Sequence, residues 1–170
     1  MMPLAANVVL FQAGWFACVL GAARGLPWTA PVAIAAVVGW HLARARRFGR
    51  ELALIALACL TGGAFDTLLV ALGLVRFHPP AALPPAWMTA LWALFATTLN
   101  VSLRSLRERP ALAGLLGAAG GPAAYYSGAR LGAIEFATVG AALAAIGTGW
   151  ALLTPALLRI ARHLDGYTQR

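Results

Sequence analysis

The sequence has no lysine and only five acidic residues among its 170. Charged residues amount to 11% of the chain, whereas a soluble domain has about a quarter. Hydrophobic residues make up 61%, and the mean hydropathy is +0.79. This scarcity of charge excludes an ordinary soluble domain and predicts an integral membrane protein. We expect a single transmembrane domain over residues 1–170.

The charge that is present does not indicate a nucleic-acid partner. The formal net charge of +8 rests on thirteen arginines, which lie at the ends of apolar segments. A nucleic-acid footprint would instead be a basic stripe with interleaved aromatic residues. We therefore expect no nucleic-acid partner, because arginines at segment ends are what membrane topology requires.

Residues that commonly take part in catalysis, metal binding or disulfide formation are also scarce. Cys18 and Cys59 lie within apolar segments, which favours buried thiols over a disulfide framework. His41, His78 and His163 lie in or beside different loops without a second ligand at metal spacing, so we expect no metal site and no cofactor. Paired intramembrane carboxylates, a G-x-S-x-G elbow and a phosphate-binding glycine loop are all missing. No catalytic residue is predicted, and the sequence favours a non-enzymatic protein.

Long apolar runs, by contrast, fill most of the chain. Six segments come close to the roughly 20 residues that cross a hydrocarbon core, and open sheets cannot satisfy their backbone in lipid. The predicted fold class is therefore all-α, a six-helix transmembrane bundle with short loops. No arginine precedes the first segment, which we interpret as a membrane span rather than a signal peptide. The expected spans are about 4–23, 27–43, 52–74, 84–104, 110–129 and 136–161.

Arginine placement predicts the orientation of this bundle. Ten arginines fall on one side and three on the other, and the positive-inside rule puts the richer side in the cytoplasm. Both termini are then cytoplasmic, with Trp28 and Trp87 at the outer interface and Trp40 near the inner one. The cytoplasmic set is Arg44, Arg46, Arg47, Arg50, Arg104, Arg107, Arg109, Arg159, Arg162 and Arg170, against Arg24, Arg76 and Arg130.

The fifth segment contains Gly120-Gly121-Pro122 near its centre. Proline lacks an amide hydrogen and its ring crowds the preceding turn, so we expect the helix to kink or break there. A broken helix could line a binding cavity, as in some transporters. We favour the simpler interpretation, a kinked span that packs closely through a small-residue stripe of Gly114, Gly117 and Gly121.

Asp66 is the most unusual residue, because it lies deep inside an apolar run, GGAFDTLLVALGLVRF. Burying a charge in a membrane costs about 2.5–3.5 kcal/mol on insertion scales, which makes such a residue a functional-site hypothesis. Cys59, Gly62 and Gly73 share its helical face, so this face should meet other helices rather than lipid. The alternative is structural: Asp66 could join helices by hydrogen bonds to Tyr125, Thr89 or Arg130.

Helix rise places several polar residues at similar depth. At 1.5 Å per residue, Asp66, Tyr125, Thr89 and Thr148 all lie about 20–22 Å from the cytoplasmic ends of their segments. Arg130 lies near the outer rim, about 30 Å up, and its long side chain could snorkel or turn inward. Gln12 and Trp15 of the first segment lie somewhat lower.

Asn100 ends a stripe of polar and small residues, with Thr89, Ala93 and Thr97, near the cytoplasmic end of the fourth segment. Packing or capping is the favoured role for this stripe. Trp92 and Trp150 are interpreted as packing bulk, with stacking on a ligand as the alternative. The candidate ligand-binding set is Asp66, Tyr125, Arg130, Gln12, Trp15, Thr89, Trp92 and Asn100.

Three stretches carry a family resemblance: LFQAGWFACVLGAA (10–23), PPAWMTALWALFATTLNVSLRSL (84–106) and GGPAAYYSGARLGAIE (120–135). In this order they resemble the bacterial inner-membrane family catalogued as domain of unknown function 2878. The resemblance implies a multi-pass protein of the inner membrane and carries no established activity. Relatives often neighbour genes for fatty-acyl modification, which implies a lipid-linked role. Many members have a histidine directly after the asparagine, where this chain has Val101.

Three functions remain open. The favoured one is binding of a lipid or small apolar molecule in an intramembrane cavity near Asp66, with membrane lipids as partners and a lipid enzyme as a further one. The second is a small proton-coupled transporter or exporter with Asp66 as the ion site. No three-plus-three repeat is visible, so a homo-oligomer would have to supply the symmetry. The third is a lipid-modifying membrane enzyme that uses Asp66 with Tyr125 or Arg130.

Overall fold

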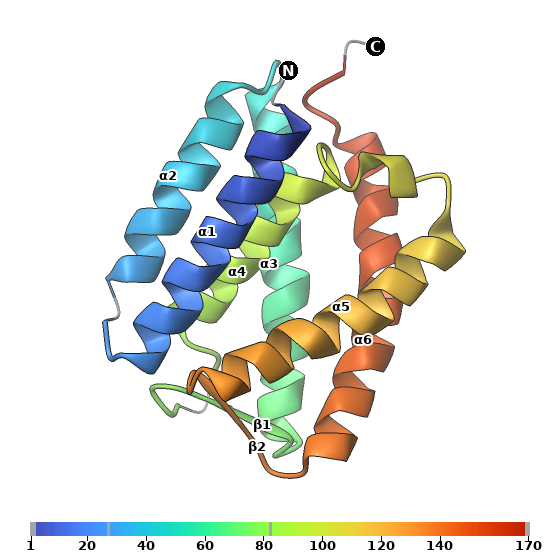
Figure 1. Cartoon of the computed structure of the whole chain (residues 1–170). Coiled ribbons are helices and arrows are strands. Elements are labelled where there is room, and N and C mark those ends of the chain that lie inside the picture. Colours follow the sequence, from blue (N-terminus) through green and yellow to red (C-terminus); the bar gives the residue numbers. More distant parts are fainter. Residues whose placement is uncertain (1–2, 27, 82, 169–170) are drawn as a thin grey trace.

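The structure is a computed structural model that describes residues 3–26, 28–81 and 83–168 (Figure 1). In this part of the chain six α-helices follow one another, so the predicted all-α class is confirmed. A short antiparallel pair of strands and one 3₁₀ turn accompany them. The helices are α1 (Leu4–Ala23), α2 (Thr29–Ala43), α3 (Phe48–Ala71), α4 (Ala86–Leu99), α5 (Pro110–Arg130) and α6 (Val139–His163), with β1 (Val75–Phe77), η1 (Arg104–Leu106) and β2 (Ile134–Phe136).

All helices except α1 differ from their predicted bounds, and α3 and α4 differ most. α3 begins at Phe48 and so includes Glu51, whose negative charge suits the first turn of a helix. α4 ends at Leu99, where Asn100 takes the C-cap position, as the capping interpretation expected. Gly73 was predicted on the Asp66 face of α3, and this was wrong. It lies in the turn beyond the helix with φ +67°, which glycine adopts readily.

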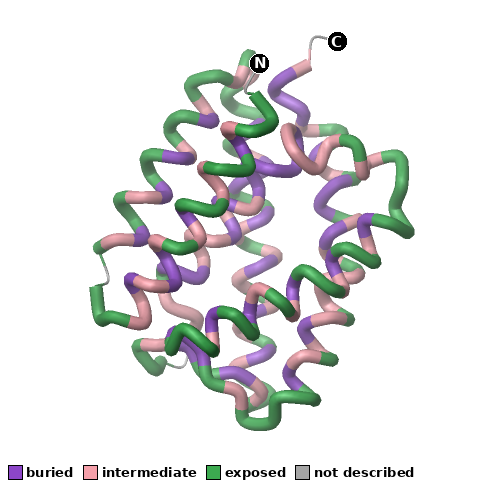
Figure 2. The backbone as a smooth tube through the Cα atoms, viewed as in Figure 1, coloured by how far each residue is buried: buried purple, intermediate pink, exposed green. Residues whose placement is uncertain are grey.

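Among the described residues, three helices are long and apolar enough to cross a membrane, namely α1, α3 and α6. α2 and α4 are shorter apolar helices, and glycine-rich α5, although 21 residues long, is not among the three candidates. Buried positions alternate with exposed ones along each helix (Figure 2). Large apolar residues such as Leu60, Leu115 and Leu152 are among the exposed ones. These features are those of a multi-pass membrane protein.

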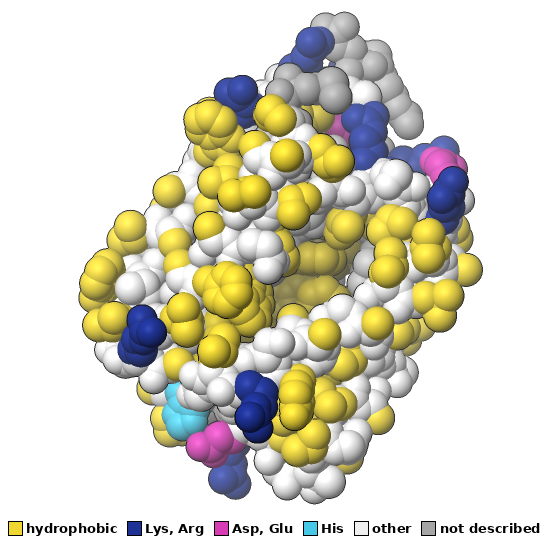
Figure 3. Space-filling view, viewed as in Figure 1, with side chains coloured by type: hydrophobic (Ala, Val, Ile, Leu, Met, Phe, Trp, Pro, Cys, Tyr) yellow, Lys and Arg dark blue, Asp and Glu magenta, His cyan; other side chains and the backbone are white. Residues whose placement is uncertain are grey.

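The ends of the molecule carry the charge, and the hydrophobic surface lies between them (Figure 3). Both termini lie at the same end, together with the α2–α3 loop, the α4–α5 linker and the end of α6 (Figure 1). These segments and the first turn of α3 contain nine of the ten arginines predicted on the cytoplasmic side; the tenth, Arg170, lies outside the described residues. The loop after α1, strand β1 and the end of α5, which carry the other three, lie at the opposite end.

The tryptophans at the helix ends do not all face the surface. Trp28 and Trp40 are exposed, as a belt at the membrane interfaces requires. Trp87 was expected in the same belt and is instead buried, with its Nε1 donating to the backbone oxygen of His78 at 2.7 Å. The indole N–H has its hydrogen-bond acceptor in the β1–α4 loop and does not need the polar membrane interface. The ring can therefore pack inside the protein.

α5 and α6 form a closely packed antiparallel hairpin. Side chains at Gly117 and Gly121 would overlap Trp150 and Thr154 of α6, so both positions require glycine for this approach. The predicted small-residue stripe is therefore confirmed. A break of the helix at Pro122 is not observed, because α5 runs as one helix from Pro110 to Arg130.

The α5–α6 hairpin joins the other four helices at its two ends and at mid-height. At the outer end, β2 pairs with β1, with Val75 opposite Phe136 and Phe77 opposite Ile134. At the other end, the segment after α6 returns over the start of α3, where the amides of Arg46 and Arg47 both donate to the Gly166 oxygen. At mid-height, Tyr125 of α5 donates a hydrogen bond to Asp66 of α3, and Trp150 of α6 stacks on Trp92 of α4.

Candidate functional site: an aromatic cavity beside Asp66

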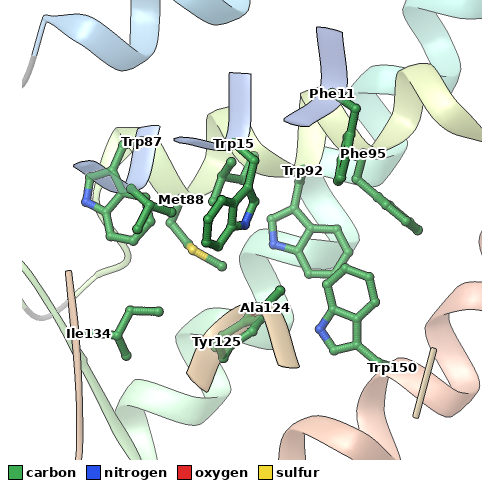
Figure 4. Close-up of a pocket in the computed structure, with 12 residues that line it drawn as sticks. Phe11, Trp15, Trp87, Met88, Trp92, Phe95, Ala124, Tyr125, Ile134 and Trp150 are labelled. Atoms are coloured by element: carbon green, nitrogen blue, oxygen red, sulfur yellow. The ribbon is translucent and has the colours of Figure 1, made fainter. Parts of the chain in front are cut away.

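A cavity of about 60 Å³ lies between α1, α4, α5 and α6 (Figure 4). It exceeds the roughly 10–15 Å³ that one water molecule needs, but its walls are almost entirely apolar, so they offer water few partners. An apolar occupant suits such walls better. The lining residues are Phe11, Trp15 and Val19 of α1, Trp87, Met88, Leu91, Trp92 and Phe95 of α4, Ala124 and Tyr125 of α5, Ile134 of β2, and Trp150 of α6.

The cavity opens sideways rather than toward an end of the molecule. Figure 3 shows a deep hollow with a hydrophobic floor, flanked by α1 on one side and by α5 and α6 on the other. The hollow lies within the hydrophobic zone between the two charged ends. An apolar chain could therefore enter from the side without crossing a polar surface.

Asp66 lies directly behind this aromatic wall. Its side chain is fully buried, its Oδ1 accepts a hydrogen bond from the Tyr125 hydroxyl, and its Oδ2 accepts one from Trp92 Nε1 at 2.7 Å. Among the described residues no cation forms an ion pair with it. The carboxylate is not among the residues that line the cavity. Two hydrogen bonds to a buried carboxylate hold both donors firmly, because a lost partner would leave a charge unsatisfied.

Trp150 completes the wall. Its ring stacks on Trp92, with centroids 4.8 Å apart and planes at 19°, and Phe95 meets it edge-on at 5.0 Å. Its indole nitrogen lies on the side of Tyr125 (Figure 4). The polar ends of Trp92 and Tyr125 point toward Asp66, so these aromatic residues turn apolar surfaces to the cavity. The cavity side of the wall is apolar because the polar atoms of Trp92 and Tyr125 are hydrogen-bonded to Asp66 on its other side.

The eight sequence-predicted residues do not form one site. Trp15, Trp92 and Tyr125 line the cavity, and Asp66 is bonded to the last two. Asn100 lies in a separate cluster at the end of the molecule that contains the termini.

The other three residues of the predicted set lie away from the cavity wall. Gln12 is exposed on α1, and Arg130 is exposed at the end of α5. Thr89 is partly buried, and its backbone oxygen lies 3.7 Å from Cys59 Sγ. Of the polar residues predicted to lie at one depth in the membrane, Asp66 and Tyr125 are in contact. Thr148 is not part of this contact, because its exposed hydroxyl donates a hydrogen bond to the Ala144 oxygen of its own helix.

Several cavity residues were not predicted from the sequence. Phe11, Trp87, Met88 and Ile134 are apolar residues in a chain where apolar residues face both lipid and protein. Hydropathy therefore gives no signal that separates these from lipid-facing side chains. Only the tertiary contacts identify them.

A second buried cluster centres on Glu51. Its Oε2 lies 2.8 Å from His41 Nε2, and its Oε1 accepts hydrogen bonds from Asn100 Nδ2 and from the Gly166 amide. His41 and Glu51 are both fully buried. The Tyr167 hydroxyl donates to the His41 backbone oxygen at 2.6 Å. Apart from the polar character of Asn100, nothing in the sequence indicated this cluster. His41 and Glu51 each lie next to an arginine-rich loop and resemble solvated groups at helix ends.

Asp165 ties the segment after α6 to the α4–α5 linker. Its Oδ2 accepts a hydrogen bond from Arg107 Nη1 at 2.9 Å, and Arg107 also donates to the Asn100 side chain. Burial alone would raise the pKa of Asp165. Hydrogen bonds from Thr168, Arg107 and the Tyr167 amide, with the charge of Arg107, outweigh it and lower the pKa to about 2. Burial and the Glu51 charge together raise the pKa of Tyr167, so it stays a neutral donor.

This second cluster is a set of satisfied contacts rather than a binding site. Every carboxylate in it already accepts hydrogen bonds, and the described residues contain no group of three or more His, Cys, Asp or Glu side chains arranged to hold a metal ion. Its effect is to fix residues 164–168 across the ends of α2 and α3. The cavity is therefore the better candidate for a functional site.

Comparison with known proteins gives one match. No curated protein and no solved structure matches the chain. A family model described as "Protein of unknown function (DUF2878)" matches residues 4–156, which include α1 to α5 and most of α6. The chain therefore belongs to the DUF2878 family.

Proposed function

We propose that this protein binds an apolar chain of a membrane lipid, or a similar small apolar molecule, in the aromatic cavity. The observation that carries the proposal is the cavity itself, which is apolar, aromatic and open to the side within the hydrophobic zone. Rigid aromatic rings give large apolar contact at little cost in side-chain entropy. Met88 adds a flexible, polarizable group that can adapt to a chain. Membrane lipids are accordingly the partners that we propose.

The proposal includes a placement in the membrane. All six helices lie in the bilayer, with both termini in the cytoplasm of a bacterium and the protein in its inner membrane. The asymmetry of the arginines supports this orientation. α2, with 15 residues, has a length of only about 22 Å, less than the roughly 30 Å of a hydrocarbon core, and packing against α1 and α4 accommodates it.

Tryptophan fluorescence tests the binding. Of the six tryptophans, Trp28 and Trp40 are exposed and the other four line the cavity. Replacing those two by phenylalanine leaves a protein whose emission comes from the cavity alone. In nanodiscs, a fatty acid brominated along its chain should quench this emission in a saturable manner, because bromine quenches only at contact distance.

A matched pair of variants separates cavity binding from contact with bulk lipid. Ala124 lines the cavity and its neighbour Ala123 is exposed. In the two-phenylalanine background, Ala124→Leu should fill the cavity and abolish saturable quenching, whereas Ala123→Leu should leave it unchanged. Equal quenching in both variants, or none in the parent, would refute the proposal.

Asp66 favours a second candidate, a small proton-coupled transporter or exporter. The observation is a fully buried carboxylate on a candidate membrane helix, with no ion-pair partner among the described residues. In proteoliposomes, Asp66→Asn should then abolish proton flux that the wild-type protein supports. A homo-oligomer or a lipid-enzyme partner remains a prediction of the sequence, and no separate observation favours a lipid-modifying enzyme.

A further inference from the structure

α5 is the wall of the cavity that is least tied to the four-helix part. It packs along α6 through Gly117 and Gly121, and it continues from η1 at one end and into β2 at the other. Toward α1 it faces the hollow rather than another helix (Figure 3). A small outward movement of α5 would therefore widen the side opening without disturbing the packing of α1 to α4.

One hydrogen bond opposes this movement. In the described part of the chain, the Tyr125 hydroxyl is the side-chain group of α5 that donates to α3, and its acceptor is Asp66. The other donor to Asp66, Trp92, belongs to α4, which packs directly on α3. The carboxylate thus joins the α5 wall through Tyr125 and the α4 wall through Trp92. At this height Trp92 also stacks on Trp150, and the Phe65 ring of α3 lies against Gly149 of α6; both contacts are apolar and neither involves α5.

We propose that α5 is a lateral gate of the cavity and that the Tyr125–Asp66 hydrogen bond is its latch. This inference rests on the proposed binding function and concerns how that site is reached. Asp66 acts as a positioning residue, since it holds the gate and does not touch the ligand. Breaking the bond leaves a buried carboxylate with one donor instead of two, which keeps the gate closed most of the time.

The rate of ligand entry tests the latch. In the background that lacks Trp28 and Trp40, stopped-flow quenching by the brominated fatty acid measures entry, and the saturated signal measures binding. Tyr125→Phe removes only the hydroxyl and should accelerate entry by about tenfold, the effect expected for losing a hydrogen bond to a charged group. Tyr126→Phe is the matched control, because Tyr126 is exposed on the same helix and should have no effect.

A reversible crosslink provides an independent measurement. A side chain at Gly132 would have its Cβ 3.9 Å from the Cβ of Ala23, within the range of disulfides, and this pair joins the ends of α1 and α5. In a background with Cys18→Ala and Cys59→Ala, oxidised Ala23→Cys/Gly132→Cys should slow entry, and reduction should restore it. Because Gly132 has φ +90°, the melting temperature of the reduced form serves as the check on folding.

The outcomes separate the two proposals. Equal entry rates in wild type, Tyr125→Phe and the oxidised crosslink, with saturable quenching intact, would overturn the gate and leave the binding function standing. Absence of saturable quenching in the unmodified background would overturn the binding function, and the gate with it.

Discussion

Individual residues determine the shape of the cavity wall, and Gly62 shows how. The Trp92 ring lies directly against α3 at this position, where a methyl group would overlap the indole. This close approach brings Trp92 Nε1 to Asp66 and places the ring between α3 and the cavity. The neighbouring Gly63 faces open space, so no packing contact requires a glycine there.

Gly62→Ala should therefore displace Trp92 and destabilise the fold by about 1–3 kcal/mol, the usual effect of overpacking. Gly63→Ala should be neutral or slightly stabilising, because alanine favours helix more than glycine does. Thermal unfolding in detergent, followed by tryptophan fluorescence, measures both. The same fall in melting temperature for the two variants would show that Trp92 does not pack as described.

At the scale of elements, residues 164–168 act as a strap across the cytoplasmic end proposed above. The strap bonds to α3 through Gly166, to the end of α2 through Tyr167 and to the α4–α5 linker through Asp165. It therefore links the α5–α6 hairpin to the four-helix part at the end opposite β1 and β2. Its polar contacts are sensitive to charge in a way that the apolar helix contacts are not.

Asp165 gives the strap a defined dependence on pH. Its pKa falls from 3.8 to about 2 on folding, so its stabilising contribution is complete above about pH 4 and is lost as the pH falls through about 2. The difference in melting temperature between wild type and Asp165→Asn should therefore be clear at pH 6 and vanish near pH 2. Glu108→Gln is the control, because Glu108 is exposed and should matter little at any pH. A difference that persists unchanged at pH 2 would contradict this assignment.

At the scale of the whole molecule, two properties combine. The arginines separate to two ends with a hydrophobic zone between them, and the side opening of the cavity lies within that zone. In the membrane placement proposed above, the cavity would therefore be open to lipid. The orientation proposed from the arginine count can be measured directly.

Cysteine labelling tests this orientation. In the background without Cys18 and Cys59, Ala81→Cys introduces a thiol in the β1–α4 loop, and Ser105→Cys introduces one in the α4–α5 linker; both positions are exposed. A membrane-impermeant maleimide should label position 81 in cells whose outer membrane is permeabilised, and position 105 only after the inner membrane is broken. The reverse pattern would invert the proposed topology.

Much of the fold could be predicted because hydropathy and charge are local properties. The six helices lie close to the six apolar segments, and Asp66 stood out because a carboxylate among leucines and glycines is unusual wherever the chain folds. The glycine stripe of α5 was likewise predicted from spacing along one helix. The β1–β2 pairing was not predicted, because each strand has only three residues and depends on its partner for definition.

The site was only partly predictable, because it depends on which helix faces meet. Hydropathy and charge along the chain were enough to predict apolar helices, arginines at the helix ends and a need for partners at Asp66. Helix packing selected Tyr125 from the three partners predicted for Asp66 and added Trp92. It also placed Asn100 with Glu51 and Trp87 at the cavity. The physical reason is that lipid and a protein interior are equally apolar, so side chains that face either one look alike until the helices are packed.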